Sequence, residues 1–470
     1  MSAPRDPGEL AAEIERLVRD YSAHVHAPSG PGGPASGSFV PGETPVPYAG
    51  RVFAGDEVAA AVRTSLDFWL TLGPQGDAFE RELAAAVGVK RSVLVNSGSS
   101  ANLLAVSSLT SAKLPAERRL RPGDEVITCA AGFPTTVAPI VQNGAVPVFI
   151  DCNPATGNAD CSRLDEAYAP GRTKAVVLAH ALGNPFDVAA VVAFCKERGL
   201  WLIEDNCDAL GSLYAPPCEA ARPTGSFGDL STQSFYPAHH ITTGEGGAVN
   251  IPRDMRFKVV LESLRDWGRD CWCASGRENT CGKRFGWTLG ELPQGYDHKY
   301  TYSHLGYNLK PLDIQAAIGR EQLKRLPGFA LARRRNWQRL RAGLAHLSDH
   351  FDFMEATPGS EPSWFGFMLL VRDGAPFTAV ELSRHLDAGK IGNRRFFGGN
   401  LVRQPAFVQL RRDNPGAFRA VGGLEGADRV MASALFVGVY PGLTSEMLDY
   451  VIGVIGDFCR KRAHRRTQSP

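Results

Sequence analysis

The sequence lacks long apolar runs, and it has no lysine over residues 197–257. No stretch of about 18 apolar residues occurs, and the first 20 residues lack the apolar segment of a secretion signal. The formal net charge is only +2 across 470 residues, so neither a nucleic acid nor a membrane surface is an expected partner. We therefore expect a soluble cytoplasmic protein. No lysine lies between Lys196 and Lys258, so this part of the chain carries no side-chain amine.

The chain is long enough for more than one domain. Its 470 residues exceed the usual domain of about 100 to 200 residues. Residues 8–24 carry apolar residues at helical spacing, and a Pro-, Gly- and Ser-rich stretch follows them, so residues 1–45 are predicted to form an N-terminal helix and a linker. Residues 46–325 are predicted to form a large domain, and residues 326–470 a smaller C-terminal α/β domain.

Short β-rich runs alternate with helical stretches through the large domain. Such alternation predicts a mostly parallel α/β sheet, whose ligands bind beyond the carboxyl ends of the strands. The predicted strands are Val93–Val95, Glu125–Thr128, Val146–Asp151, Ala175–Ala179 and Trp201–Glu204. Residues 265–304 are instead rich in Trp, Gly, Cys and Tyr, with little periodicity. An irregular segment of that length is usually functional or disordered, and its tryptophans and cysteines favour a functional loop.

Small and acidic residues follow two of the predicted strands. The segment 96–102, Asn-Ser-Gly-Ser-Ser-Ala-Asn, opens a helical run, where main-chain amides and hydroxyls can hold a phosphate. Such residues also cap helices that bind no ligand. Asp205 ends the strand 201–204, where its carboxylate can pair with a protonated ring nitrogen or cap the next helix. Both features fall at the edge of the sheet where ligands bind.

A histidine occupies a position that a known enzyme family gives to lysine. The segment 234–247, Ser-Phe-Tyr-Pro-Ala-His-His-Ile-Thr-Thr-Gly-Glu-Gly-Gly, resembles the cofactor-attachment stretch of the DegT/DnrJ/EryC1/StrS sugar aminotransferases. In that family a lysine five residues after the serine holds pyridoxal phosphate (PLP) as a Schiff base, and here that position is His239. An imidazole cannot form this bond, but it can accept and return a proton near neutral pH. The resemblance therefore implies a B6 enzyme without covalent attachment, with His239 as its base.

The resemblance runs from Val46 to the C-terminus and implies a fold and a set of cofactor ligands. The implied fold is α/β, of the aspartate-aminotransferase (type I PLP) kind, in a homodimer with shared active sites. Three serines match phosphate ligands, a phenylalanine matches the aromatic ring that stacks on the pyridine, an aspartate matches the partner of the pyridine nitrogen, and an asparagine matches the residue that reaches the neighbouring subunit's phosphate. A lone phenylalanine is also a common core residue. These residues are Ser99, Ser100, Ser234, Phe133, Asp205 and Asn308.

Three neighbours of His239 are candidates for supporting roles. His240 would be the base if the alignment shifted by one residue, but the motifs on both sides favour His239. Tyr236 is a candidate proton donor, although strand tyrosines usually serve packing. Asp208 stands where many of these aminotransferases have Gln or His. Its carboxylate can orient His239 or assist a departing hydroxyl, and an ordinary surface role is equally compatible with its position.

Three cysteines lie close together in the irregular loop. Cys271 and Cys273 form a Cys-x-Cys pair, seven residues separate that pair from Cys281, and Cys207 follows Asp205 by two residues. Four thiolates suit a structural zinc or an iron–sulfur cluster, and spacing alone does not separate the two. A metal on Cys207 would lie close to the ring that Asp205 binds, which favours an electron relay. The remaining cysteines show no such clustering and are expected to be small buried side chains or residues without a specific role: Cys129, Cys152, Cys161, Cys195, Cys218 and Cys459.

This cysteine pattern, together with Tyr-Pro-Ala-His-His-Ile-Thr, is similar to the NDP-4-keto-6-deoxyhexose 3-dehydrases of the family. The resemblance implies that free pyridoxamine phosphate (PMP) forms a Schiff base with the C4 ketone of an NDP-4-keto-6-deoxyhexose, that His239 removes a C4′ proton, and that the C3 hydroxyl leaves. Two single electrons would come from a separate reductase or ferredoxin through a 2Fe–2S cluster on the four cysteines. Arg394 or Arg395 would hold the nucleotide diphosphate, or would be an ordinary solvated pair.

Three other functions are compatible with parts of the sequence. A cluster-free dehydratase of the same fold also has histidine for lysine and regenerates PMP with glutamate. A non-catalytic B6-binding protein is a second alternative, although it has no need of a Cys-x-Cys loop. An ordinary aminotransferase fits least, because the attachment segment contains no lysine.

Overall fold

The computed structural model describes residues 5–26, 39–273 and 276–467. Its central layer is an eight-stranded sheet with the order β1-β9-β8-β5-β4-β2-β3-β14. Strand β9 runs antiparallel to β1 and β8, and the remaining neighbours pair in parallel. The strands are β1 Arg91–Val95, β2 Glu125–Cys129, β3 Val146–Ile150, β4 Thr173–Ala179, β5 Trp201–Asp205, β8 Leu230–Ser234, β9 Gly247–Ile251 and β14 Arg419–Ala420. The prediction of a mostly parallel α/β sheet is confirmed.

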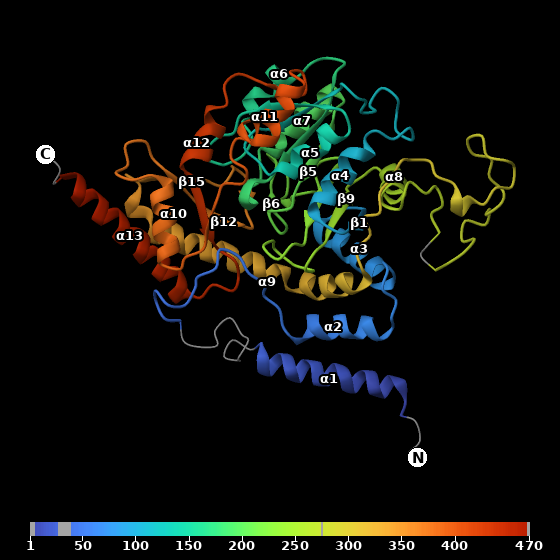
Figure 1. Cartoon of the computed structure of the whole chain (residues 1–470), viewed down its shortest axis with the longest axis horizontal. Coiled ribbons are helices and arrows are strands. Elements are labelled where there is room, and N and C mark those ends of the chain that lie inside the picture. The colour runs from blue at the N-terminus through green and yellow to red at the C-terminus, as the bar shows by residue number, and fades with distance from the viewer. Residues whose placement is uncertain (1–4, 27–38, 274–275, 468–470) are drawn as a thin grey trace.

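Helices alternate with these strands and pack against them (Figure 1). Local signals start several of them. Ser97 caps α4 by accepting a hydrogen bond from the Ser100 amide, and Asp187 caps α7 by accepting from the Ala190 amide. Pro134 occupies the first position of α5. These helices are α3 Pro74–Val87, α4 Gly98–Ser108, α5 Pro134–Gln142, α6 Leu164–Ala167, α7 Val188–Arg198 and α8 Arg256–Arg265.

A smaller antiparallel sheet forms the C-terminal part, with the order β10-β12-β15-β13. Its strands are β10 Phe351–Phe353, β12 Gly366–Val371, β13 Asn393–Arg395 and β15 Ala434–Gly438. Its helices are α10 Ala379–Ala388, α11 Pro405–Asp413, α12 Glu425–Ser433 and α13 Ser445–Thr467. Two short strands tie this part to the rest of the chain. β14 joins the large sheet beside β3, and β11 (Ser360–Glu361) pairs with β6 (Leu213–Tyr214), which also pairs with β7 (Arg222–Pro223).

The long helix α9, Asp313–Gly343, links the two sheets as one continuous element (Figure 1). It packs against α3 at one end and against β12 and α13 at the other. The boundary predicted at residues 325 and 326 therefore falls inside a helix, which continues through Pro327. The division of the chain at residues 45 and 325 stays a prediction. Helix α9 continues from the predicted large domain into the small one, and strand β14 of the predicted small domain joins the large sheet.

The N-terminal residues form a helix and then a strap that crosses the molecule. Helix α1 spans Pro7–Val25, as the spacing at residues 8–24 predicts, and lies beside α2, Gly55–Leu66 (Figure 1). From residue 44 to residue 52 the chain runs along the C-terminal part. The Val46 amide donates to the Lys390 carbonyl at 2.9 Å. We call residues 44–52 the strap.

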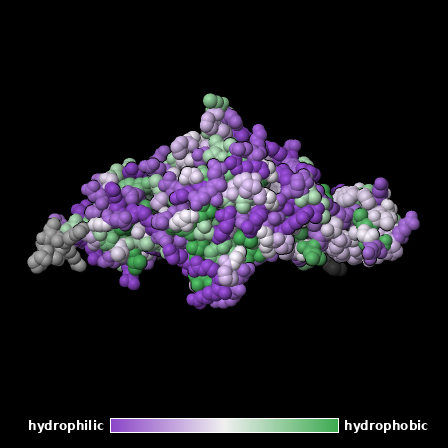
Figure 2. Space-filling view, turned by 90° about the horizontal axis from the view of Figure 1, so that it is seen from above, coloured by the Kyte–Doolittle hydropathy of each residue, from purple (hydrophilic) through white to green (hydrophobic). Residues whose placement is uncertain are grey.

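The surface mixes polar and apolar side chains. Figure 2 shows polar groups over most of one face, with apolar groups collected in a few places. Among the exposed apolar side chains are Phe68, Trp69, Trp272, Phe285 and Leu305. Within the residues that the structure describes, no helix combines the length and the apolar character that a membrane span requires.

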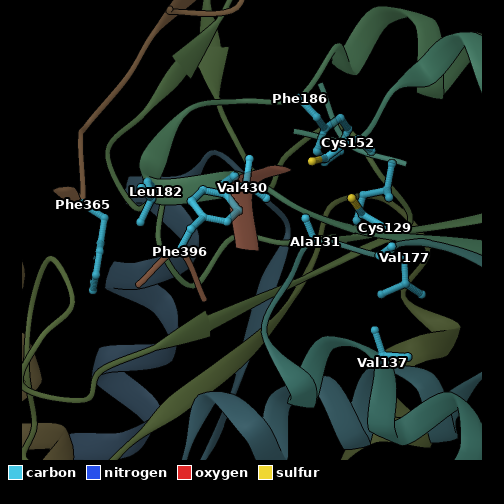
Figure 3. Close-up of a cluster of buried hydrophobic side chains, with 14 of the residues drawn as sticks. Cys129, Ala131, Val137, Cys152, Val177, Leu182, Phe186, Phe365, Phe396 and Val430 are labelled. Carbon is cyan, nitrogen blue, oxygen red and sulfur yellow. The ribbon is translucent and has the colours of Figure 1, made fainter. Parts of the chain in front are cut away.

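The main hydrophobic core fills the space around the large sheet and continues into the smaller one. Cys129 and Cys152 lie in it beside Val177 and Phe186 (Figure 3). Burial raises the pKa of the Cys129 thiol to about 12, so this side chain is a neutral, small core residue. Cys195 and Cys459 are also buried. Cys161 is half-buried and Cys218 is exposed, so Cys218 matches the alternative of a cysteine without a structural or functional role.

The carboxylate of Asp313 caps a helix to which it does not belong. Helix α3 begins after Gly73, which has no side chain to accept its free amides. Asp313, at the start of α9, accepts from the amides of Gly73 (2.8 Å), Gln75 (3.2 Å) and Gly76 (2.8 Å). The side chain is buried, so it fixes the start of α3 against α9.

Replacing Asp313 by alanine should lower the free energy of unfolding by about 2 to 4 kcal/mol, because one buried and two half-buried amides lose their acceptor. Urea unfolding followed by circular dichroism measures the change, with the exposed Asp67→Ala variant as the control. If D313A unfolds at the same urea concentration as the wild type, the cap contributes nothing to stability.

Candidate functional site

A cavity of about 320 Å³ opens where strands β4, β5 and β8 end. The large sheet provides one wall, the starts of α4 and α5 provide another, and the C-terminal sheet closes the third. This is the edge of the sheet at which the sequence predicts a ligand site. The predicted site residues that line the cavity are Ser99, Phe133, Asp205, Cys207, Asp208, Ser234, Tyr236 and His239.

Asp205 lies at the end of β5 and is only 5% exposed. Its Oδ2 accepts hydrogen bonds from Asn102 Nδ2 (2.9 Å) and Thr136 Oγ1 (2.6 Å). Its Oδ1 accepts from the Cys207 amide (3.2 Å) and from Thr232 Oγ1 (3.4 Å). Within the described residues, none of these partners carries a charge and no cation lies within ion-pair distance. A buried carboxylate of this kind is suited to bind a protonated ring nitrogen that enters the cavity.

Two helix starts and three hydroxyl groups surround the other end of the cavity. Ser99, in the first turn of α4, donates from its hydroxyl to Thr135 Oγ1 at 3.1 Å, and Thr135 lies in the first turn of α5. Gly98 packs directly against Ser234, because a Cβ at Gly98 would lie 2.4 Å from the Ser234 Cβ. Free amides and hydroxyls at helix starts bind phosphate. The missing side chain of Gly98 brings Ser234 close to the start of α4.

These groups fit a phosphorylated pyridine. The buried carboxylate of Asp205 suits the ring nitrogen, and the hydroxyls of Ser99, Thr135 and Ser234 suit the phosphate. Phe133 lines the cavity with 52% of its surface exposed, which leaves its ring free to stack on a flat ligand.

His239 and Asp208 form a pair at the cavity wall. His239 Nδ1 lies 3.2 Å from Asp208 Oδ1, an ion-pair distance, although the alignment is poor for a hydrogen bond. Because Nδ1 faces the carboxylate, Nε2 is the ring nitrogen left for a ligand. Burial raises the pKa of Asp208, and His239 opposes that rise. Unlike His239, His240 lies outside the cavity. Its Nε2 is 2.6 Å from the Ser363 carbonyl, and burial lowers its pKa well below the ordinary value.

Arg333 lies behind this pair and was not predicted from the sequence. Its guanidinium is 1% exposed and donates to the carbonyls of His239 (3.1 Å), Trp364 (3.1 Å) and Phe365 (3.4 Å). The ring of Phe365 in turn lies 5.4 Å from the His239 imidazole, centroid to centroid. Burial lowers the pKa of Arg333 to about 10, and Asp208 opposes the change. Arg333 therefore binds the main chain of His239 and also the main chain of Phe365, whose ring packs against the imidazole.

Two predicted phosphate ligands lie away from the cavity lining. The Ser100 hydroxyl accepts from Ser97 Oγ at 3.0 Å, so it takes part in the cap of α4. Asn308 is exposed on the segment that pairs with Asp266, at a distance along the chain from every lining residue. Within one chain, the structure does not bring either residue to the cavity.

The four predicted metal ligands are not assembled in one place. Cys271, Cys273 and Cys281 line a small pocket in the loop that projects beside α8 (Figure 1), whereas Cys207 lines the large cavity and contacts Thr232. The two pockets have no residue in common. Among the described residues, no three His, Cys, Asp or Glu side chains are arranged as a metal site. The structure therefore does not show the expected metal site next to Asp205. Cys207 contacts Thr232 on β8, whereas the loop with the other three cysteines lies outside the cavity.

The three loop cysteines nevertheless influence one another. Desolvation raises the pKa of Cys271, and the neighbouring Cys273 and Cys281 raise it further. For Cys273, desolvation is outweighed by hydrogen bonds with Thr280, the Cys281 main chain and Cys271, which lower its pKa to about 7. A thiol of this kind is partly ionised at neutral pH and is reactive toward electrophiles and metals.

Several lining residues carry no sequence signal of their own. Asn102 and Thr136 reach Asp205 from helices far away in the chain, and although Asn102 ends the predicted segment 96–102, its contact with Asp205 was not predicted. Thr135 and Thr136 do follow Phe133 in the predicted stacking motif, which is the one clue to their position. Tyr48 and Phe436 enter from the strap and from β15.

In metal-free protein, alkylation by iodoacetamide should show a fast phase whose rate is half-maximal near pH 7, because Cys273 forms a thiolate there. Burial raises the pKa of Cys129, Cys161 and Cys459 to about 12, so these thiols should react slowly. Mass spectrometry of tryptic peptides identifies the site, and the fast phase should disappear in Cys273→Ser. A fast phase that persists in C273S would contradict the assignment.

Comparison with known proteins places this geometry in a family. The chain is 50% identical over 444 residues to the dTDP-4-dehydro-2,6-dideoxy-D-glucose 3-dehydratase of Saccharopolyspora spinosa, covering 94% of this chain and 91% of that protein. It is 49% identical over 449 residues to the lipopolysaccharide biosynthesis protein RfbH of Salmonella typhimurium, covering 96% and 98%. A solved structure of GDP-4-keto-6-deoxymannose-3-dehydratase with a trapped PLP–glutamate geminal diamine is similar with a TM-score of 0.73 and 27% identity, over 87% of this chain and 99% of that one.

The structural similarity confirms the predicted aspartate-aminotransferase-like fold. The model of the DegT/DnrJ/EryC1/StrS aminotransferase family matches residues 54–456, which include every residue that lines the cavity except Tyr48. The chain therefore belongs to the DegT/DnrJ/EryC1/StrS aminotransferase family.

Proposed function

We propose that this chain is a B6-dependent 3-dehydratase that removes the C3 hydroxyl of an NDP-4-keto-6-deoxyhexose in deoxysugar biosynthesis. The observation that carries the proposal is the His239–Asp208 pair in a cavity whose described lining contains no lysine. Covalent PLP attachment requires that lysine, whereas proton transfer requires only a base. The 50% identity to a dTDP-sugar 3-dehydratase supports the same reaction class.

Different cavity residues would bind different parts of the cofactor. Asp205 would pair with the pyridine nitrogen, Phe133 would stack on the ring, and Ser99 and Ser234 would hold the phosphate with the amides at the start of α4. When bound as PMP or PLP, the cofactor supplies an electron sink next to the reacting carbons of the sugar.

His239 and its neighbours would handle protons. Its Nε2 would take up and return the proton at C4′ of the cofactor, while Asp208 orients the imidazole through Nδ1 and stabilises the charged form. Tyr236 lines the same wall with half of its surface exposed, where its hydroxyl would donate a proton to a leaving group. Phe365 and Phe397 exclude water from the far side of the cavity.

A second copy of the chain would complete the phosphate site. Asn308 is exposed and lies next to Leu305, which is 98% exposed. A fully exposed leucine beside exposed Trp267 and Tyr302 is typical of a surface that is covered in an assembly. We propose a homodimer in which Asn308 of one subunit reaches the phosphate bound by the other.

The proposal also includes an iron–sulfur cluster as the source of electrons. Cys271, Cys273 and Cys281 place three thiols together on the projecting loop, and Cys273 has a lowered pKa. A 2Fe–2S cluster takes four protein ligands, and Cys207 is not near the other three in this chain. We propose that these three thiols would supply ligands to a cluster whose fourth ligand lies outside the loop, and that electrons would come from a separate reductase or ferredoxin.

A cluster-free dehydratase that regenerates PMP with glutamate is the second candidate. It is supported by the similarity to a 3-dehydratase trapped with PLP and glutamate, and by the separation of Cys207 from the loop cysteines. The two candidates use the same cavity and differ in their source of electrons.

Replacing His239 by Asn should lower kcat by about 100-fold or more, because the group that moves the C4′ proton is lost. Binding of PMP, titrated by its absorption spectrum, should change by less than about threefold, since His239 does not hold the phosphate or the ring nitrogen. Turnover is measured by chromatography of the NDP-sugar product, with CDP and TDP substrates. The His346→Asn variant, the same change at an exposed histidine outside the cavity lining, is the matched control. Unchanged turnover in H239N would assign the proton transfer to another residue.

Double substitution of Cys271 and Cys273 by Ser separates the two candidates. For the cluster enzyme, anaerobically purified wild type should contain iron and acid-labile sulfide, and the double variant should lose both together with reductase-coupled turnover. For the cluster-free enzyme, turnover should require glutamate and should be equal in both proteins. The Cys218→Ser variant, at an exposed cysteine outside the loop, is the control.

A further inference from the structure

Two arginines face the cavity without an acidic partner. Arg394 and Arg395 on β13 both line the cavity, and within the described residues no carboxylate lies within ion-pair distance of either. Arg395 donates to the carbonyls of Met431 and Ala432 through Nη2, while its Nη1 is buried with no hydrogen-bond partner. Cations held by carbonyls and left with free N–H groups are suited to bind an anion.

The Arg394 guanidinium is stacked on an aromatic ring. Its Cζ lies 4.2 Å from the centroid of the Tyr48 ring, and its Nη1 donates to the Asn393 carbonyl at 2.8 Å. A guanidinium that lies flat on an aromatic ring loses rotational freedom but keeps its N–H groups at the edge available. The ring of Phe436 packs edge-on against Tyr48, with centroids 6.1 Å apart. Tyr48 is therefore a fixed platform for Arg394.

The strap delivers Tyr48 to this place by close main-chain contacts. The Gly392 amide donates to the Val46 carbonyl at 2.8 Å, which fixes the strap beside β13. A Cβ at Gly392 would lie 2.8 Å from the Tyr48 nitrogen, and one at Gly438 would lie 2.4 Å from the Tyr48 oxygen. Both glycines thus leave the space that the strap occupies. Tyr48 lies outside residues 54–456, the part that the family model matches.

We propose that Tyr48 is a positioning residue, which holds Arg394 so that Arg394 and Arg395 bind the diphosphate of the nucleotide-sugar substrate. This inference rests on the proposed function, because the diphosphate is the anion that such a substrate brings. It adds a residue of the N-terminal strap to a site built otherwise from the two sheets. The cofactor cradle lies on the opposite wall, so the loss of Tyr48 should affect substrate binding and leave the handling of the C4′ proton intact.

Isothermal titration of the full-length protein with CDP, TDP and GDP, and with the matching nucleosides, tests this inference. For the diphosphate that binds best, Tyr48→Leu should raise Kd about three- to tenfold. Tyr48→Phe should stay within about twofold of wild type, because the ring is kept. Arg394→Met should raise Kd about 10- to 100-fold. The matched control is Phe53→Leu, which removes a ring that contacts Arg51 just beyond the strap and outside the cavity.

In turnover assays, Y48L should raise KM and leave kcat within about twofold of wild type. This is the result expected when the lost contact stabilises the bound substrate and the transition state equally. Equal weakening of diphosphate and nucleoside in Y48L would show that the ring contacts the base, and would overturn the inference. So would equal weakening in F53L, which would make the effect one of strap folding. If wild type binds none of the diphosphates, the proposed substrate class fails. If wild type binds and Y48L is unchanged, only the role of Tyr48 fails.

Discussion

A buried carboxylate without a cationic partner sets the geometry of the cavity. Burying a charge costs several kcal/mol unless hydrogen bonds or an opposite charge compensate. Asp205 recovers part of that cost from Asn102 on α4, Thr136 on α5 and Thr232 on β8. These donors belong to three separate elements, so the charge fixes the starts of both helices relative to the end of β5. The side of Asp205 that faces the cavity is left for a cation, and a protonated pyridine nitrogen meets that need in the proposed function.

Arg333, which lies behind the His239–Asp208 pair, follows the same principle with the opposite charge. Arg333 is a buried cation that binds carbonyls, and the nearest carboxylate, Asp208, acts on it through space. Asp208 keeps one oxygen free of any hydrogen bond. Such an arrangement is less stable than apolar packing of the same volume, and it is typical of sites where a group changes its charge during a reaction. An imidazole between Asp208 and Phe365 can gain a proton without moving, because a carboxylate already faces it.

The sequence was sufficient to predict the parts that depend on local pattern. Buried parallel strands form short apolar runs, and β2, β3, β4 and β5 lie within a few residues of the predicted ranges. Residues at the ends of such strands meet at one edge, which is why Asp205, Ser234 and His239 lie around one cavity.

Contacts between distant segments could not be predicted in this way. Helix α9 runs through residue 325 because its apolar spacing continues while its neighbours change from α3 to β12 and α13, so no break in the pattern marks the end of a domain. The two residues of β14 join the large sheet although they follow the C-terminal sheet strand β13. Cys207 and the loop cysteines have a spacing that suggests one site, but the loop projects away from the sheet that carries Cys207. Chain spacing limits only the greatest distance between two residues and does not make them meet.

The two walls of the cavity have separate structural origins, and this separation has a consequence for specificity. The large sheet with α4 and α5 supplies the groups suited to the cofactor, whereas β13, β15 and the strap supply Arg394, Phe436 and Tyr48. Helix α9 runs without a break from the large sheet to the C-terminal sheet. The strap forms main-chain hydrogen bonds with Lys390 and Gly392, which immediately precede β13. The distance between the walls is therefore fixed by main-chain structure and not by the side chains that face the ligand. In the proposed function, side chains on β13, β15 and the strap could consequently differ in size or charge while Asp205 and His239 keep their positions, so a different substrate would not require different groups to move the proton.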